Sequence, residues 1–129
     1  MALIVIDASV VIALLDPADA LHAAARSGLE RVAGDDLAIP ASALAETLVA
    51  PGRAGKLEEA RQRIHELELR VIDIGEEVAV EAARLRGRHR HLRLPDALVI
   101  ATAAVLESDA LLTGDARWRS LSSRVRVTG

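Results

Sequence analysis

Cysteine, phenylalanine and tyrosine are absent from this chain of 129 residues, and Trp118 is its only aromatic side chain. The lack of cysteine excludes disulfide bonds and thiolate metal sites, as in proteins of a reducing compartment. The lack of phenylalanine and tyrosine excludes a platform of aromatic rings on which nucleic acid bases could stack. Hydrophobic residues make up 51% of the chain. Its core is therefore expected to consist of alanine, leucine, valine and isoleucine.

The chain also lacks a strong net charge and a long uninterrupted apolar run. Its formal net charge of -3 gives no overall attraction to nucleic acid, so RNA binding would need a local cluster of positive charge. The apolar stretch at residues 2–15 is interrupted by Asp7, follows no basic segment and is shorter than the roughly 20 residues of a membrane span. We therefore expect a cytoplasmic protein without a membrane segment, with a single domain over residues 1–129.

Alternating strand and helix patterns predict an α/β fold. Residues 3–6 form a β-branched run without polar alternation, which is typical of a strand buried on both faces of a parallel sheet. We expect Asp19 to cap the second helix, Pro51 and Gly52 to end the third, and Pro95 to lie in the first turn of the last. The other strands are predicted at 37–39, 71–74, 110–112 and 125–127, and the helices at 9–15, 19–33, 42–50, 56–67, 76–89 and 96–107. This order predicts a mainly parallel central sheet wrapped by helices.

Four acidic residues are placed so that they can meet at one edge of this sheet. Asp7 follows the first strand, Asp115 comes just after the strand at 110–112, Asp96 lies in the first turn of the last helix, and Glu46 lies one turn into the third helix. Sites in open α/β sheets lie beyond the carboxyl ends of the strands. Carboxylates gathered there repel one another, and a divalent cation removes that repulsion. Magnesium suits such a site because it takes oxygen ligands and retains water.

Each acid also has a simpler explanation. Asp96 can stabilise a helix N-terminus, Asp115 can initiate a turn, and Glu46 can be a solvated helix residue. Asp7 is the hardest to explain in this way, because it interrupts a run that otherwise has the composition of a core. The histidines show no zinc-binding context and the serines no nucleophile elbow. Spacing alone leaves a shared metal site and four unrelated acids as alternatives.

Four sequence segments around these acids resemble the ordered motifs of a known family. They are VIDASVVIALL around Asp7, SALAETL around Glu46, LRLPDALVIATAA around Asp96 and LLTGDARW around Asp115. Together they span residues 4–118 and resemble the PIN-domain family, within it the VapC-type toxins of toxin–antitoxin pairs. The resemblance implies a PIN-like three-layer α/β/α fold and an endoribonuclease that depends on Mg²⁺ or Mn²⁺. It also implies a cognate antitoxin partner and favours a homodimer.

Carried over residue by residue, the resemblance gives Asp7, Glu46, Asp96 and Asp115 the role of the family's acidic quartet. Asp7, Asp96 and Asp115 would bind the metal directly or through water. Glu46 would hold a water molecule or a second ion.

Three further residues match or depart from the family's pattern. Ser9 and Thr113 stand at positions where the family often has hydroxyl groups, so they would orient the metal ligands. Both could equally be ordinary caps, Ser9 especially. Trp118 stands where the family commonly has phenylalanine, and we expect this departure to affect packing rather than chemistry.

A basic stretch leads into Asp96. No acid lies between Glu81 and Asp96, and the stretch contains Arg84, Arg86, Arg88, His89, Arg90, His91 and Arg93. Guanidinium groups fit phosphate oxygens, and local positive charge offsets the repulsion between an acidic site and RNA. We therefore predict that RNA phosphates are bound by Arg88, Arg90, Arg93 and Arg117. The alternative is that these arginines complement a helix C-terminus and keep the surface soluble.

The sequence favours a toxin-like endoribonuclease over two other classes of protein. A phosphorylatable receiver domain has a similar fold class and also uses acids and magnesium, but Lys56, the only lysine, lies on a charged helix rather than after a late strand. A noncatalytic PIN-like scaffold would not need the intact acidic quartet. For the antitoxin, we expect an apolar groove beside Glu46, formed by the helices at 19–33 and 42–49, that takes an amphipathic segment.

Overall fold

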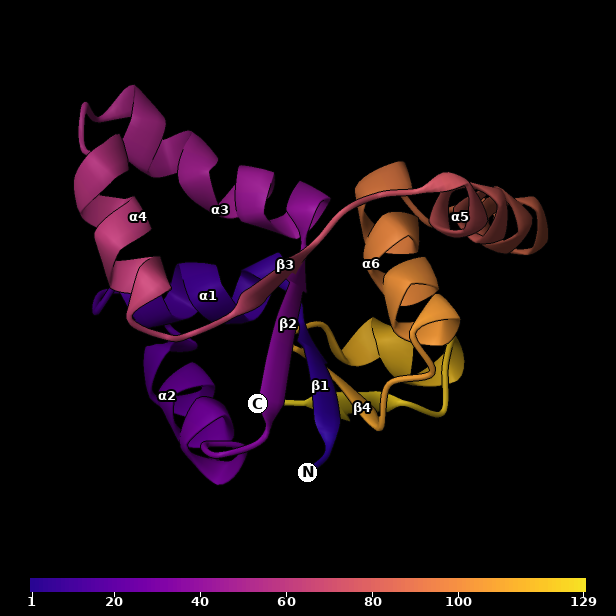
Figure 1. The fold of residues 1–129 in the computed structure, drawn as a ribbon, viewed down its shortest axis with the longest axis horizontal. Helices are drawn as coiled ribbons and strands as arrows, with labels where there is room; N and C mark the ends of the chain where they lie inside the picture. Colours follow the sequence, from indigo (N-terminus) through magenta and orange to yellow (C-terminus); the bar gives the residue numbers. More distant parts are fainter.

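The computed structural model describes residues 1–129 as a five-stranded sheet with helices on both sides (Figure 1). The strand order is β3-β2-β1-β4-β5, and all four pairings are parallel. The strands are β1 (Leu3–Ile6), β2 (Asp36–Pro40), β3 (Arg70–Ile72), β4 (Ala110–Thr113) and β5 (Val125–Val127). The α-helices are α1 (Ala8–Leu15), α2 (His22–Arg31), α3 (Ala41–Arg53), α4 (Leu57–His65), α5 (Glu76–Arg88) and α6 (Leu94–Val105), and the 3₁₀ helix η1 spans Ala116–Ser120. The predicted α/β class and parallel sheet are confirmed.

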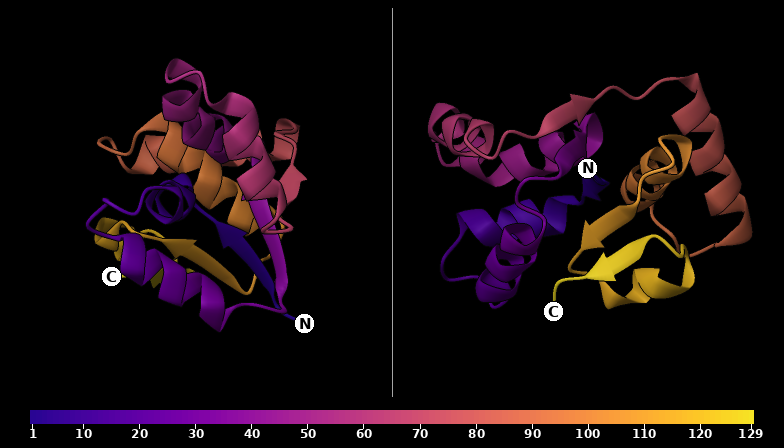
Figure 2. Two further views of the ribbon diagram at one scale, coloured as in Figure 1. Left: turned by 90° about the vertical axis from the view of Figure 1, so that its left-hand side faces the viewer. Right: turned by 60° about the horizontal axis from the view of Figure 1, so that its bottom comes forward.

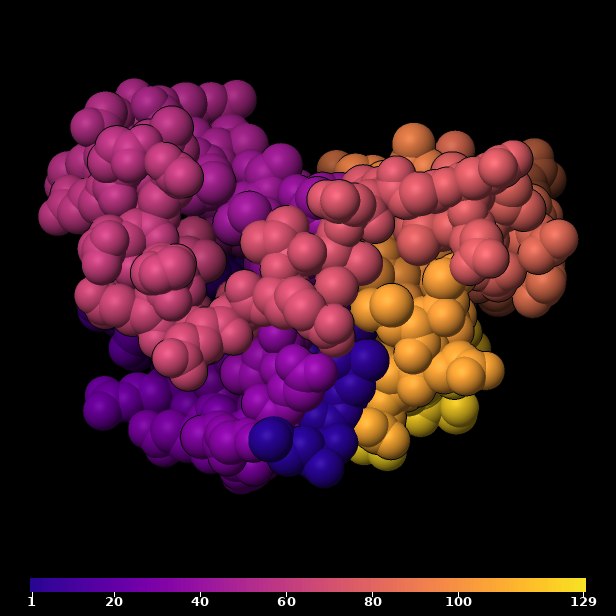
Figure 3. All heavy atoms as spheres, in the orientation of Figure 1, coloured from indigo at the N-terminus to yellow at the C-terminus, as the bar shows by residue number.

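The helices form layers on opposite sides of the sheet. In Figure 1, α1, α2 and α4 lie on one side, α5 and α6 lie on the other, and α3 starts at the carboxyl end of β2 and runs toward α4. The right view of Figure 2 shows the same separation. Strand β3 is an edge strand and crosses the front of the molecule (Figure 3). Its residue Val71 is exposed. No helix of the chain combines the length and the apolar character that crossing a membrane requires.

The strand order changes direction at β1, and this creates the site. The chain adds β2 and β3 on one side of β1 and then returns to place β4 and β5 on the other. In parallel sheets such a switch point opens a crevice beyond the carboxyl ends of the two strands. Ile6 at the end of β1 pairs with Leu112 in β4. Asp7 and Thr113, the next residues of the two strands, therefore lie side by side at the crevice.

The core is built from aliphatic side chains, as the composition predicts. The central strands contribute Ile6, Ile39 and Leu111, each with 0% of its surface exposed. Because β1 is covered by helices on both faces, it needs no polar alternation. Trp118 is also buried and packs with this core. Asp7 is the only charged side chain among the buried residues.

Two local predictions about helix ends are wrong. Asp19 accepts a hydrogen bond from the Leu21 backbone N–H and closes a turn, so α2 begins only at His22. Helix α3 instead continues through Pro51 to Arg53, although Pro51 has no backbone N–H to donate within the helix. Gly55, in the left-handed conformation with φ of +72°, provides the stop instead.

The ends of α1 and β3 also differ from the predictions. Helix α1 begins at Ala8 with Asp7 as its N-cap residue, so Ser9 lies inside the helix and is not a cap. Its hydroxyl is used elsewhere, as described below. Strand β3 spans Arg70–Ile72 rather than 71–74.

Candidate active site

Two hydroxyl groups hold the carboxylate of Asp7. Ser9 Oγ donates to Asp7 Oδ2 at 2.6 Å, and Thr113 Oγ1 donates to the same oxygen at 2.9 Å. The backbone N–H of Gly114 donates to Ser9 Oγ at 2.9 Å, and that of Asp115 donates to Thr113 Oγ1 at 3.1 Å. Each hydroxyl is thus oriented by the loop after β4. Both bond to Oδ2, so Oδ1 of Asp7 receives no side-chain hydrogen bond.

The loop after β4 packs closely at Gly114. A Cβ atom at Gly114 would lie 3.4 Å from Ser9 Oγ and 3.4 Å from a methyl group of Leu21, at the limit of ordinary van der Waals contact. The position therefore has room for little more than a glycine.

Burial dominates the electrostatics of Asp7. Only 7% of the residue is exposed, and the loss of water raises its pKa above the ordinary value of 3.8, even though hydrogen bonds from Ser9 and Thr113 act in the opposite direction. A buried carboxylate of this kind is stabilised by a nearby cation.

Glu46 and Asp96 lie close enough to Asp7 to interact with its charge. Burial is the largest cause of the raised pKa of Glu46, followed by repulsion from Asp7 and Asp96, and Arg93 opposes the shift. Burial is also the largest cause of the raised pKa of Asp96, followed by repulsion from Asp7. The structure therefore brings these three acids, widely separated in sequence, to one edge of the sheet. Their mutual repulsion calls for positive charge.

Asp115 differs from the other three acids because Arg117 neutralises it. Arg117 Nη2 donates to Asp115 Oδ2 at 2.7 Å, and Arg117 Nε donates to Asp115 Oδ1 at 3.0 Å. The backbone N–H of Arg117 also donates to Oδ1, at 2.9 Å, so that Asp115 caps η1. The hydrogen bond from the Arg117 side chain is the main reason that the pKa of Asp115 is lowered. Asp115 still raises the pKa of Asp96, so it belongs to the same cluster.

The four acids form a cluster of charge rather than a finished ligand cage. No three acidic or histidine side chains are arranged as a ready set of metal ligands, and both oxygens of Asp115 are bound to Arg117. The donor set nevertheless fits a hard divalent cation, because it consists of carboxylate oxygens with no sulfur or imidazole in the quartet. The raised pKa values of Asp7, Glu46 and Asp96 point the same way, since a cation would remove the repulsion that contributes to two of them.

Beside Asp96 and Asp115 lies a basic pocket of about 320 Å³, which we call the Trp118 pocket. Its lining includes Arg90, Arg93, Asp96, Asp115, Arg117 and Trp118. Three of the four arginines predicted to bind RNA thus lie around the acids. Arg88, at the end of α5, is exposed and does not line the pocket. The pocket wall formed by Trp118 was not predicted from the sequence, and its signal was the position of that residue three places after Asp115 in LLTGDARW.

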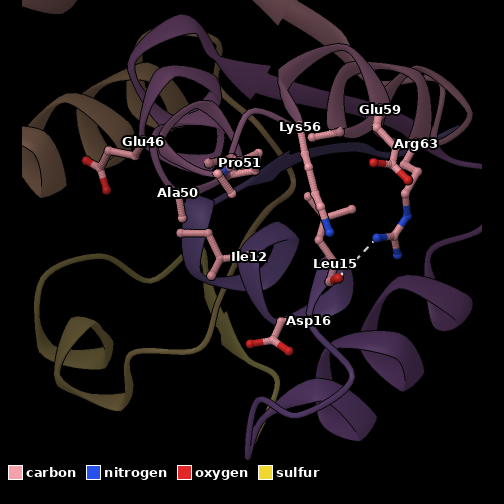
Figure 4. Close-up of a pocket in the computed structure, with 12 residues that line it drawn as sticks. Ile12, Leu15, Asp16, Glu46, Ala50, Pro51, Lys56, Glu59 and Arg63 are labelled. Carbon is pink, nitrogen blue, oxygen red and sulfur yellow. Dashed lines mark hydrogen bonds between the residues drawn. The ribbon is translucent and has the colours of Figure 1, made fainter.

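On the other side of the cluster, a groove runs between α1, α3 and α4 (Figure 4). Glu46 lies at one end of this α1/α3/α4 groove, and at the other end Arg63 donates to the Leu15 carbonyl oxygen at 3.1 Å. The volume of the groove is about 420 Å³. A groove beside Glu46 was predicted, but with the helix at 19–33 as one wall. That helix, α2, instead packs against α1 and buries Ala25 and Gly28.

The pKa shifts predict how the stability of the metal-free protein depends on pH. The folded-state pKa of Asp7 is raised, so the folded chain retains a proton that the unfolded chain releases, and this contribution to stability is lost as pH rises above the ordinary value of 3.8. Asp115, whose pKa is lowered, contributes in the opposite sense. Asp7→Asn should therefore gain stability relative to wild type as pH rises above the ordinary pKa of 3.8, measured by urea unfolding in EDTA. Parallel pH profiles of the two proteins would contradict this assignment.

Comparison with known proteins places the chain in a family. Among the solved structures that share its fold are a toxin–antitoxin complex from Klebsiella pneumoniae, VapBC2 from Rickettsia felis bound to a promoter DNA fragment, and Mycobacterium tuberculosis VapC20, a sarcin–ricin loop cleaving toxin. The TM-scores are 0.79, 0.79 and 0.78, at sequence identities of 22%, 15% and 20%. The alignments cover 97%, 97% and 92% of this chain and 97%, 98% and 95% of the others, in the same order.

No curated protein sequence matches the chain significantly. The PIN domain family, in contrast, matches residues 4–123, which include all four acids and the loop that holds Asp7. The chain belongs to the PIN domain family.

Proposed function

We propose that this chain is a metal-dependent endoribonuclease and the toxin of a toxin–antitoxin pair. The observation that carries the proposal is the meeting of Asp7, Glu46, Asp96 and Asp115 at the switch point of the sheet, where three of their pKa values are raised. Membership of the PIN domain family and the shared fold with toxins such as VapC20 support it. The four acids remain separated by long stretches of sequence, so their convergence is a property of the fold rather than of a local motif.

The acids and hydroxyl groups of the site have different proposed roles in hydrolysis. Asp7, Asp96 and Asp115 would hold Mg²⁺ or Mn²⁺, and Glu46 would hold a water molecule or a second ion. When bound, such an ion polarises the phosphodiester and lowers the pKa of an attacking water. Ser9 and Thr113 fix the direction of the Asp7 carboxylate, so that Oδ1 is available for binding.

The arginines around the cluster would make the acidic site accessible to RNA. Arg90, Arg93 and Arg117 line the Trp118 pocket next to two of the acids, so their charge offsets the repulsion between the carboxylates and a phosphate chain. Arg93 also lowers the pKa of Glu46 and of Asp96, so its charge acts on both acids. Arg88 lies outside the pocket, and its contact with RNA stays a prediction from the sequence alone.

The α1/α3/α4 groove is the proposed binding site of the antitoxin. Its floor includes Ile12 and Pro51, and its rim carries three acids, Asp16, Glu46 and Glu59, against two bases, Lys56 and Arg63. An amphipathic helix with a basic polar face would complement this surface. A basic side chain of the partner that reached past Glu46 would neutralise the acids and so inhibit cleavage. The homodimer implied by the resemblance also stays a prediction.

The two alternative functions are a receiver domain and a noncatalytic scaffold, and only the scaffold needs an experiment to exclude it. A receiver domain is disfavoured because Lys56 lines the α1/α3/α4 groove at the start of α4 and not the crevice at β1 and β4. A scaffold would have no need for acids that repel one another at a switch point.

The direct test is cleavage of RNA by the purified chain. We expect Mg²⁺ or Mn²⁺ to support cleavage that leaves a 5′-phosphate, and excess EDTA to abolish it, because the acids need a cation to act together. Sequencing of RNA ends after the reaction checks both the activity and the cut sites. Full activity in excess chelator would overturn the metal dependence, and a folded, metal-loaded chain that cleaves no RNA would favour the scaffold.

The ion pair between Arg117 and Asp115 predicts competition with the metal. Because Arg117 binds both oxygens of Asp115, Arg117→Ala should free that carboxylate and tighten Mn²⁺ binding by up to about fivefold, the size expected for an exposed pair. The same change should weaken RNA binding, since it removes a phosphate contact. Isothermal titration calorimetry measures the first effect and a filter-binding assay the second.

Arg119→Ala is the matched control for this prediction. Arg119 lies on the same 3₁₀ helix and is exposed, but it does not line the Trp118 pocket. Its replacement removes the same net charge. Equal changes in Mn²⁺ affinity in the two variants would show that only net charge matters and that Arg117 does not compete for Asp115.

A further inference from the structure

The two cavities beside the acidic cluster differ in charge. The Trp118 pocket has three guanidinium groups, from Arg90, Arg93 and Arg117, against the two carboxylates of Asp96 and Asp115. The α1/α3/α4 groove has three carboxylates against two basic side chains. A phosphate chain that reaches the acids is therefore attracted to the Trp118 pocket and repelled from the groove.

The Trp118 pocket also has the shape and the apolar surface needed for more than a phosphate. Its volume of about 320 Å³ lies within the range of about 300–1,000 Å³ that is typical of small-ligand sites. Leu121 supplies partly exposed hydrophobic lining, backed by the buried side chains of Leu92 and Trp118. His89 and His91 supply ring nitrogens that can bond to polar atoms. Single-stranded RNA is read in this way, by apolar contact with the face of an unstacked base and hydrogen bonds to its edge.

The basic wall of the pocket is fixed before any ligand binds. It consists of the loop between α5 and α6, residues 89–93, and Arg86 Nε donates to the Leu92 carbonyl oxygen of that loop at 2.9 Å. The backbone N–H of Leu92 donates to the His89 carbonyl oxygen at 3.0 Å, which closes the turn. Ordering such a loop in advance lowers the entropic cost of binding.

Resting on the proposed function, we propose that the Trp118 pocket binds a single nucleotide of the RNA, the one that adjoins the phosphodiester at the acids. Arg90 and Arg93 bind its phosphate, and its base lies against the apolar surface at Leu121, with the buried Trp118 behind it. The pocket therefore selects the nucleotide beside the cut, whereas the arginines outside it can act only on the backbone.

Titration of the whole protein with 5′-nucleoside monophosphates tests this proposal. These ligands contain no phosphodiester, so Mg²⁺ can be present without cleavage. Binding is followed by the fluorescence of Trp118, the only tryptophan, and by isothermal titration calorimetry. We expect at least one of AMP, GMP, CMP and UMP to bind about tenfold more tightly than inorganic phosphate, because the base adds apolar contact and hydrogen bonds.

Two arginine variants separate a pocket from general positive charge. Arg90→Ala should weaken mononucleotide binding by about tenfold, the effect of removing a charge-assisted hydrogen bond. Arg84→Ala removes the same charge from the same basic stretch, but Arg84 lies on α5 outside the pocket and pairs with Glu81. It should change binding by less than about twofold, because exposed pairs contribute little.

Three results would overturn the nucleotide pocket. They are binding of mononucleotides no tighter than that of phosphate, equal effects of Arg90→Ala and Arg84→Ala, and cleavage of RNA with no mononucleotide binding. In the last case the proposed nuclease function stands and only the pocket fails. Selective mononucleotide binding by a chain that cleaves no RNA would support the nucleotide pocket and contradict the proposed nuclease function.

Discussion

Asp96→Asn should reduce RNA cleavage at saturating Mg²⁺ by at least about 100-fold, since changes even to residues that merely orient metal ligands cost about 10–100-fold. The substitution keeps the size of the side chain and removes one negative charge from the cluster. The pKa of Asp96 is raised by burial and by repulsion from Asp7, so the metal-free variant should be as stable as wild type or more stable. Initial cleavage rates and urea unfolding in EDTA measure the two effects.

The same substitution tests the simpler explanation of Asp96. If the carboxylate only stabilises the N-terminus of α6, Asp96→Asn should leave cleavage unchanged and lower stability by about 0.3–1 kcal/mol. The two explanations therefore predict different activities, and only the simpler one predicts a loss of stability. Asp73→Asn, at an exposed aspartate just after β3, is the matched control and should leave both quantities unchanged. Full turnover by Asp96→Asn would remove this residue from the site.

Expression of the wild-type chain in a host without its antitoxin should arrest growth, and Asp7→Asn should abolish the arrest. The variant should still fold, because an asparagine oxygen at the position of Oδ2 can accept the hydrogen bonds from Ser9 and Thr113. It removes the buried charge that a cation needs. Colony counts with and without induction measure the effect. Circular dichroism of the purified variant checks that it is folded.

Two controls complete the growth experiment. Asp73→Asn should arrest growth as wild type does. Co-expression of the toxin with its antitoxin should yield an inactive complex. Charge reversal at Glu59, on the rim of the α1/α3/α4 groove, should weaken that complex. Harmless expression of folded, metal-loaded protein in a host that contains no such partner would contradict the toxin function.

The order of the elements could be predicted from the sequence because it depends on local patterns. The run of apolar residues at β1 specifies a strand covered on both faces, and Pro95 in the first turn of α6 fits its fixed φ and missing N–H. The alternation of strands with helices then leaves a parallel sheet as the simplest arrangement. Asp7 and Asp115 were found as candidates for the same reason, since each follows a strand.

Helix ends were less predictable because side chains and single backbone conformations compete for them. Pro51 is a helix breaker by its chemistry, yet α3 continues for two residues beyond it. Ser9 is a good cap by composition, but its hydroxyl bonds instead to Asp7 and to the backbone of Gly114. In both cases the outcome depends on neighbours that a local pattern does not include.

By itself the sequence determined the α/β class and the parallel sheet. It also identified acids that follow a strand, such as Asp7 and Asp115, or that lie near the start of a helix, such as Asp96. Only the tertiary structure decided which atoms meet: Thr113 bonds to Asp7 across 106 positions of sequence, and the loop at 89–93 forms a pocket with η1. The physical reason is the range of the interactions. Strand and helix patterns arise from neighbours a few residues apart, whereas the charges and cavities of the site depend on the strand order, which places β4 beside β1.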